Sequence, residues 1–122
     1  MKGMKVRMAK NYRQNARLSS MIPIQVLLED HSIVDALVDN IGFGGVKLRM
    51  SVPIPVGNLV RLAIGHQDTM LSVVAECVWI KPASTVTYDY SGGFSFQGVS
   101  LETYQKIRNL LFELADNDLM DL

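Results

Sequence analysis

Short apolar runs separated by turn signals recur along this sequence and constrain its fold more than any other feature. The runs are rich in aliphatic and β-branched residues, and clusters of glycine, proline and polar residues interrupt them about every ten residues. This spacing predicts the strands of an antiparallel barrel or sandwich. The expected strands are residues 21–29, 33–40, 46–50, 59–64, 69–80 and 92–99.

The hydrophobic period changes after residue 100. The apolar residues that follow recur at helical spacing and are Leu101, Tyr104, Ile107, Leu110, Leu111 and Leu114. This spacing predicts one amphipathic helix over residues 101–115. Ser100 is a suitable N-cap, because its hydroxyl can accept a backbone N–H of the first turn. We expect the leucine face of the helix to pack over one end or side of the barrel.

Length and composition indicate one globular domain. The chain has 122 residues, of which 48% are hydrophobic and 20% are charged. No apolar run approaches the roughly 18 residues needed to span a bilayer, and no apolar stretch of signal-peptide type follows the N-terminus. We therefore expect no membrane insertion. The single cysteine, Cys77, excludes an internal disulfide and favours the reducing cytoplasm.

The charges are unevenly distributed, although the formal net charge is zero. The first 17 residues contain no acid and carry six basic residues, which are Lys2, Lys5, Arg7, Lys10, Arg13 and Arg17. We interpret residues 1–17 as a basic arm that precedes a single domain, residues 18–122. A local basic segment on a neutral protein indicates an anion site and not a general DNA-binding surface. The alternative is that its first three basic residues only solubilise the chain end.

No residue pattern indicates catalysis. His31 and His66 lie in expected turns without neighbouring ligand residues, so we interpret both as surface residues and predict no metal site. Cys77 is expected to be a small buried hydrophobe, since nothing near it in the sequence would lower its pKa. The expected core also includes the aromatic residues Trp79, Phe94 and Phe96. The chain is therefore predicted to bind a ligand and not to catalyse a reaction.

Two segments carry the binding prediction. The first is Arg13-Gln-Asn-Ala-Arg17, whose guanidinium groups can turn toward one ligand and pair with phosphate or guanine. The second is Asn40-Ile-Gly-Phe-Gly-Gly45, whose glycines leave the backbone open to a ligand. One strand, a turn and a second strand separate the segments, which returns the glycine turn toward the arginines. The alternatives are solvated arginines and a plain hairpin turn.

These two segments resemble the fingerprint of the PilZ domain family, a bacterial receptor module for cyclic di-GMP. The family pattern is R-x-x-x-R followed by [D/N]-x-S-x-x-G, which Arg13, Arg17, Asn40 and Gly45 match. The resemblance covers nearly the whole chain, including residues 54–57, 78–80 and 93–96 and the closing helix. It implies a six-stranded antiparallel β-barrel with one C-terminal α-helix, no enzymatic activity and no cofactor.

One position departs from the family pattern, because Gly42 replaces the serine. The lost hydroxyl removes a hydrogen bond worth about 0.5–1.5 kcal/mol, which weakens binding roughly threefold to tenfold. Asn40 in place of aspartate is expected to weaken ligand binding less, since an amide accepts hydrogen bonds less strongly than a carboxylate. An alternative register uses Asp39 and Gly44 but places Ile41 at the serine position, which is a worse fit.

The resemblance implies a role for each site residue. Arg13 and Arg17 would bind phosphate and guanine, Asn40 a guanine edge, and Gly45 would leave room for the nucleotide. Ligand binding would order the basic arm and alter a surface that faces a protein partner of the motility, pilus or exopolysaccharide machinery. Two alternatives remain. One is a degenerate PilZ-like interaction module without nucleotide binding, and the other is an unrelated barrel that binds oligonucleotides.

Overall fold

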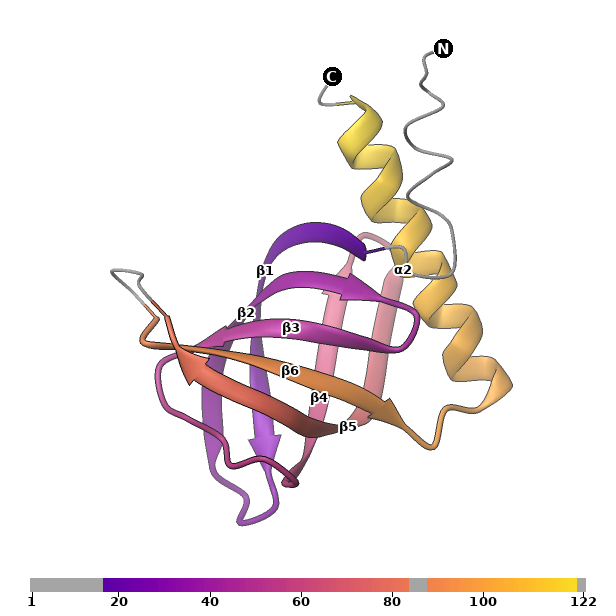
Figure 1. Cartoon of the computed structure of the whole chain (residues 1–122). Helices are drawn as coiled ribbons and strands as arrows, with labels where there is room; N and C mark the ends of the chain where they lie inside the picture. The colour runs from indigo at the N-terminus through magenta and orange to yellow at the C-terminus, as the bar shows by residue number, and fades with distance from the viewer. Residues whose placement is uncertain (1–16, 84–87, 121–122) are drawn as a thin grey trace.

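The computed structural model describes residues 17–83 and 88–120, which form six strands and a helix (Figure 1). The elements are β1 (Arg17–Leu28), β2 (Ile33–Gly42), β3 (Gly45–Met50), β4 (Leu59–His66), β5 (Thr69–Pro82), β6 (Tyr90–Gln97) and α2 (Leu101–Met120). The strands close into an antiparallel barrel in the order β1-β2-β3-β6-β5-β4. The expected six-stranded antiparallel barrel with a C-terminal helix is thus confirmed.

The barrel interior is filled by side chains that alternate along the strands. In β4 the buried residues are every second one, and their neighbours face outward. The largest fully buried side chains come from several strands, the β3–β4 loop and the helix, and include Val38, Ile41, Leu48, Ile54, Leu62, Leu71 and Ile107. Phe94 and Phe96 belong to this core, as expected from the sequence. The side chains that face outward from the strands are therefore the ones available to form a binding site on the outside of the barrel.

β-Bulges in β2 and β5 shift this alternation. In β2 the pairing passes from Val38 to Asn40, so Asp39 is the extra residue. In β5 the pairing with β6 passes from Cys77 to Trp79, so Val78 is the extra residue. A bulge reverses which residues face outward beyond it. Trp79 therefore lies on the outer wall with 37% of its surface exposed, and its expected place in the core was wrong.

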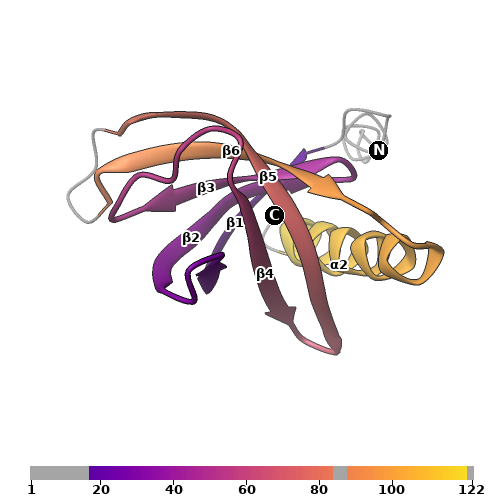
Figure 2. The same ribbon diagram turned by 90° about the horizontal axis from the view of Figure 1, so that it is seen from below.

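Helix α2 packs mainly against β5 and lies at one side of the barrel in both views (Figures 1 and 2). Its buried face consists of Ile107, Leu110, Leu111, Leu114 and Ala115. Each fully buried aliphatic side chain of this kind contributes about 1.5–3 kcal/mol. The leucine face therefore holds the helix to the barrel, as expected.

The ends of α2 differ in part from the prediction. The Ser100 hydroxyl accepts the backbone N–H of Thr103 at 3.1 Å, so the predicted N-cap is confirmed. The helix continues to Met120, five residues beyond the expected end at residue 115. Leu101 and Tyr104 were expected on the apolar face of the helix, but both are exposed. The apolar face therefore begins at Ile107.

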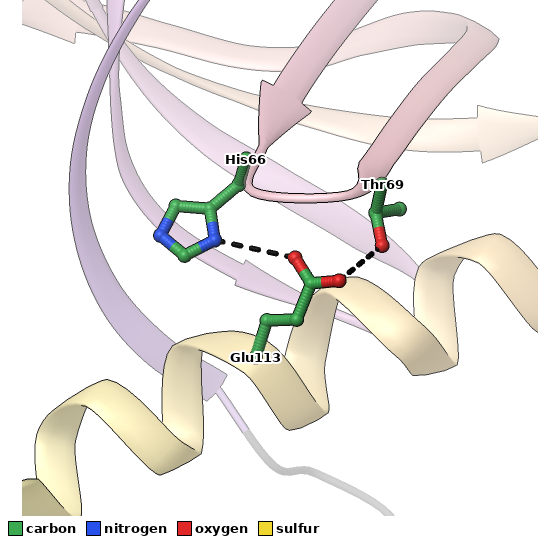
Figure 3. A network of polar contacts seen from close by, with 3 residues as sticks. All are labelled: His66, Thr69 and Glu113. Atoms are coloured by element: carbon green, nitrogen blue, oxygen red, sulfur yellow. Dashed lines mark hydrogen bonds and ion pairs between the residues drawn. The ribbon is translucent and has the colours of Figure 1, made fainter.

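A polar contact joins the middle of α2 to the β4–β5 hairpin (Figure 3). The carboxylate of Glu113 accepts a hydrogen bond from the Thr69 hydroxyl at 2.5 Å and lies 3.3 Å from Nδ1 of His66. The His66 and Glu113 side chains are less than one-fifth exposed. His66 is the last residue of β4, so the expectation of a surface turn residue was wrong for it. His31 is exposed in the β1–β2 turn, as expected.

Candidate functional site

The strand register brings most of the predicted ligand residues to one end of β1, β2 and β3. Gly42 ends β2 and pairs with Arg17, the first residue of β1, while Asn40 pairs with Ser19. Two residues separate the end of β2 from Gly45, the first residue of β3. The first strand was expected to begin at Met21, so Arg17 belongs to the strand and does not precede it. Arg13 and the guanidinium of Arg17 lie outside the described part of the chain, and the boundary of the basic arm at residue 17 stays a prediction.

A pocket of about 390 Å³ opens on the outer wall beside this end of the barrel, and we call it the outer pocket. Its lining residues come from β2, β3, β6 and β5 and from the β2–β3 turn. These four strands are neighbours in the barrel (Figure 2). Two of the predicted site residues, Asn40 and Gly45, line it. The other lining residues are Gly44, Val46, Lys47, Val78, Trp79, Gly93, Phe94 and Ser95.

Gly45 is required by the close approach of β3 to β6. A Cβ atom there would overlap the backbone carbonyl of Phe94, which is too rigid to move aside. Gly44 has open space where its Cβ would lie, and its carbonyl accepts the backbone N–H of Phe96 at 2.9 Å. The two glycines therefore differ, since Gly45 permits strand packing and Gly44 leaves an uncovered backbone at the pocket.

Trp79 forms the far wall of the outer pocket and was missed as a site residue. Its indole ring covers Gly93, its partner in the register of β5 and β6, so closely that a Cβ on Gly93 would overlap the ring. The Lys81 ammonium lies 5.4 Å from the ring centroid, a cation–π distance. This half-exposed aromatic face can stack against a flat ring. The signal in the sequence is the Gly92-Gly93 pair, which leaves room for a large ring on the opposite strand.

Lys47 and Ser95 are the polar lining residues that the sequence analysis also missed. Lys47 faces outward from β3, and its ammonium lies 3.4 Å from the Asp39 carboxylate. Arg49 lies 3.3 Å from the other oxygen of the same carboxylate. Asp39 is thus held by two cations, while its neighbour Asn40 lines the pocket. This placement favours the register that assigns the ligand role to Asn40 over the one that assigns it to Asp39.

Cys77 and the histidines, the other candidate reactive residues in the sequence, are not part of the outer pocket. Cys77 is fully buried, and its thiol donates to the carbonyl of Ile54 at 3.3 Å. Burial raises the pKa of the Cys77 thiol, as expected for a buried hydrophobe without an activating partner. Among residues 17–83 and 88–120, histidine, cysteine and acidic side chains form no group that could hold a metal ion. In the same residues, no helix is both long and apolar enough to span a membrane.

A closed six-stranded barrel with a polar and aromatic pocket on its outer wall defines a class of small β-barrel module. Comparison with protein families gives the family itself. The PilZ domain model matches residues 11–113, and this chain therefore belongs to the PilZ domain family. PilZ domains are ligand-binding receptor modules, generally without enzymatic activity.

Solved structures share this fold at low sequence identity. The PilZ domain of Escherichia coli YcgR, solved with cyclic di-GMP, has a TM-score of 0.75 and 15% identity over 90% of this chain and 96% of that one. The PilZ domain of CeSA from a cellulose-synthesizing bacterium has a TM-score of 0.63 and 22% identity over 80% of this chain and 96% of that one. No curated protein sequence matches the chain significantly.

A longer protein also contains this fold. The Bacillus subtilis inhibitor of motility MotI/DgrA has a TM-score of 0.69 and 17% identity, over 91% of this chain and 53% of that one. The present chain thus corresponds to about half of that protein. These likenesses establish the fold.

Proposed function

We propose that this protein is a receptor for cyclic di-GMP that binds the nucleotide in the outer pocket without catalysing a reaction. The observation that carries the proposal is the convergence of Asn40 and Gly45 with the exposed Trp79 in one pocket, next to the strand pair of Arg17 and Gly42. The ligand has two phosphates and two guanines, so its site needs cations, hydrogen-bond partners for a base edge and a stacking surface. The described pocket supplies the last two and one lysine, Lys47.

The arginines supply the cations in this proposal. β1 begins at Arg17, which pairs with Gly42 beside the glycine turn, and Arg13 precedes Arg17 by four residues in the sequence. Both guanidinium groups would grip phosphate and guanine, and Asn40 would accept from a guanine edge. Ligand binding would order the basic arm and change a surface that faces a protein partner of the motility, pilus or exopolysaccharide machinery. We place this signalling role in the cytoplasm.

Titration calorimetry with cyclic di-GMP tests the proposal. Loss of a charge-assisted contact costs about 1.5–3 kcal/mol, so Arg17→Ala is expected to weaken binding roughly tenfold or more. Arg61→Ala is the matched control, since Arg61 is exposed on β4 and does not line the outer pocket. Equal affinity of the wild type and Arg17→Ala would exclude the arginine role.

A second function, protein interaction without nucleotide binding, is favoured by one observation. Gly42 carries no side chain, so the hydroxyl of the family pattern is absent beside Arg17. Chemical-shift perturbation on adding cyclic di-GMP separates the two functions. Shifts confined to Asn40, Gly45, Trp79 and their neighbours would support the receptor. The absence of shifts at saturating nucleotide would support the protein-interaction function.

A further inference from the structure

Lys47 is positioned to contact a ligand in the outer pocket. It projects outward from β3 directly opposite Asn40 in the strand register, and both residues line the pocket. About one-third of its side chain is exposed, so the ammonium can reach solvent and an incoming anion. Neither the basic arm nor the family pattern includes this residue.

The partner of Lys47 is shared with a second cation. The bulge in β2 places Asp39 against both Lys47 and Arg49, at 3.4 Å and 3.3 Å from its two carboxylate oxygens. Arg49 lies two residues along β3 and does not line the outer pocket. If Lys47 turns toward a ligand, Asp39 keeps an ion pair with Arg49. The carboxylate is therefore not left unpaired by the exchange.

The energies favour such an exchange. Partly exposed ion pairs contribute about 0–1 kcal/mol, because solvent screens them and ordering the side chains opposes them. A phosphate offers Lys47 a charge-assisted hydrogen bond in place of this weak contact. The uncharged Asn40 opposite does not compete for the ammonium as a carboxylate would. The pocket thus holds a cation at low cost until an anion arrives.

We propose that Lys47 is a phosphate-binding residue of the outer pocket, which Asp39 holds ready in the absence of ligand. Its contact offsets part of the affinity lost through the missing hydroxyl at Gly42. This proposal rests on the proposed binding of cyclic di-GMP, and it names a cation for the site within the described barrel.

Three substitutions in the same ion-pair cluster test the role of Lys47. Calorimetry with cyclic di-GMP is expected to show roughly tenfold weaker binding for Lys47→Met, the value for one lost charge-assisted contact. Asp39→Asn frees the ammonium and is expected to tighten binding. Arg49→Met is the matched control, since it removes the same charge from the same cluster and is expected to stay within about threefold of the wild type. Thermal unfolding verifies that each variant is folded, and Lys47→Gln replaces any Lys47→Met protein that is not.

The direction of the affinity change in each variant distinguishes the possible roles of Lys47. If Lys47 only pairs with Asp39, the Lys47 and Asp39 variants break the same contact and shift affinity in the same direction, which would overturn the proposal. If only net charge matters, Arg49→Met weakens binding as much as Lys47→Met, which would also overturn it. In both cases wild-type binding leaves the receptor function standing. No binding by the wild type refutes the receptor function, and the role of Lys47 with it.

Discussion

The indole ring of Trp79 covers Gly93 on the outer wall of the barrel, where the two residues pair across β5 and β6. The ring can lie flat against the wall because Gly93 has no side chain, and the bulge at Val78 turns it outward. The chain has one tryptophan, so its fluorescence reports on this position alone. Tryptophan fluorescence can therefore test whether the bulge at Val78 presents the ring of Trp79 as a stacking surface.

Gly93→Ala is expected to displace the ring of Trp79 from the wall, because the added methyl group would overlap it. The emission maximum should shift to longer wavelength as the indole becomes more exposed. Stacking of one base contributes about 1–3 kcal/mol, so the affinity for cyclic di-GMP should fall roughly fivefold or more. Gly44→Ala, which meets no atom within 4 Å, should leave the emission unchanged. Unchanged emission in Gly93→Ala would contradict the described contact.

Gly42→Ser restores the hydroxyl of the family pattern. We expect it to tighten cyclic di-GMP binding roughly threefold to tenfold, the value of one neutral hydrogen bond. Calorimetry measures the change, and Gly42→Ala is the matched control, since it adds a side chain at the same position without the hydroxyl. Equal or weaker affinity in Gly42→Ser would count against the register that uses Asn40 and Gly45.

Gly45→Ala is expected to destabilise the barrel, since the new Cβ atom would overlap the Phe94 carbonyl and push β3 away from β6. Overpacking of this kind costs about 1–3 kcal/mol in the free energy of unfolding. Gly44→Ala has open space and should change that free energy little. Urea unfolding followed by circular dichroism compares the two, and equal stability would show that the strands can separate without cost.

Glu113→Gln tests the contact between α2 and the β4–β5 hairpin. An amide retains one acceptor oxygen where the carboxylate serves both Thr69 and His66, so we expect a loss of about 1–2 kcal/mol. The control is Glu102→Gln, which breaks an exposed pair with Lys106 and should cost about 0.2–0.5 kcal/mol. Chemical denaturation measures both, and similar small losses would show that the helix is held by its apolar face alone.

The raised pKa of Cys77 predicts the pH dependence of stability at alkaline pH. In the unfolded chain the thiol ionises near its ordinary pKa of 9.0, while burial keeps it protonated in the folded protein. The folded state then binds more protons, so the free energy of unfolding decreases as pH rises above 9.0. Cys77→Ala should reduce this slope. Native Cys77 should also resist iodoacetamide until denaturant is added, and rapid alkylation of the folded protein would disprove its burial.

The period-2 and helical patterns were sufficient to predict an antiparallel barrel or sandwich and one helix, because they report which side chains are buried. The resemblance to the PilZ family then implied the six-stranded barrel. Phe94, Phe96 and Cys77 follow these patterns and lie in the core. Asn40 and Gly45 were assigned to one site through the family pattern, and both line the outer pocket.

Bulges explain what the sequence could not predict. An extra residue in a strand reverses the alternation beyond it, and its presence depends on the neighbouring strand. Trp79 was therefore assigned to the core, although the bulge at Val78 turns it outward. The pairing of Asp39 with Lys47 and Arg49 depends in the same way on the bulge in β2. The contact of His66 with Glu113 requires the packing of α2, which no local pattern specifies.

Phe43 lies between Gly42 and Gly44, and its ring stacks on Tyr104 of α2 with 5.4 Å between centroids and 25° between planes. Such a pair contributes about 0.5–1.5 kcal/mol beyond the area it buries. The glycine turn and the first part of the helix therefore cannot shift independently without separating the two rings. Displacement of the glycine turn would therefore break a contact with the N-terminal part of α2.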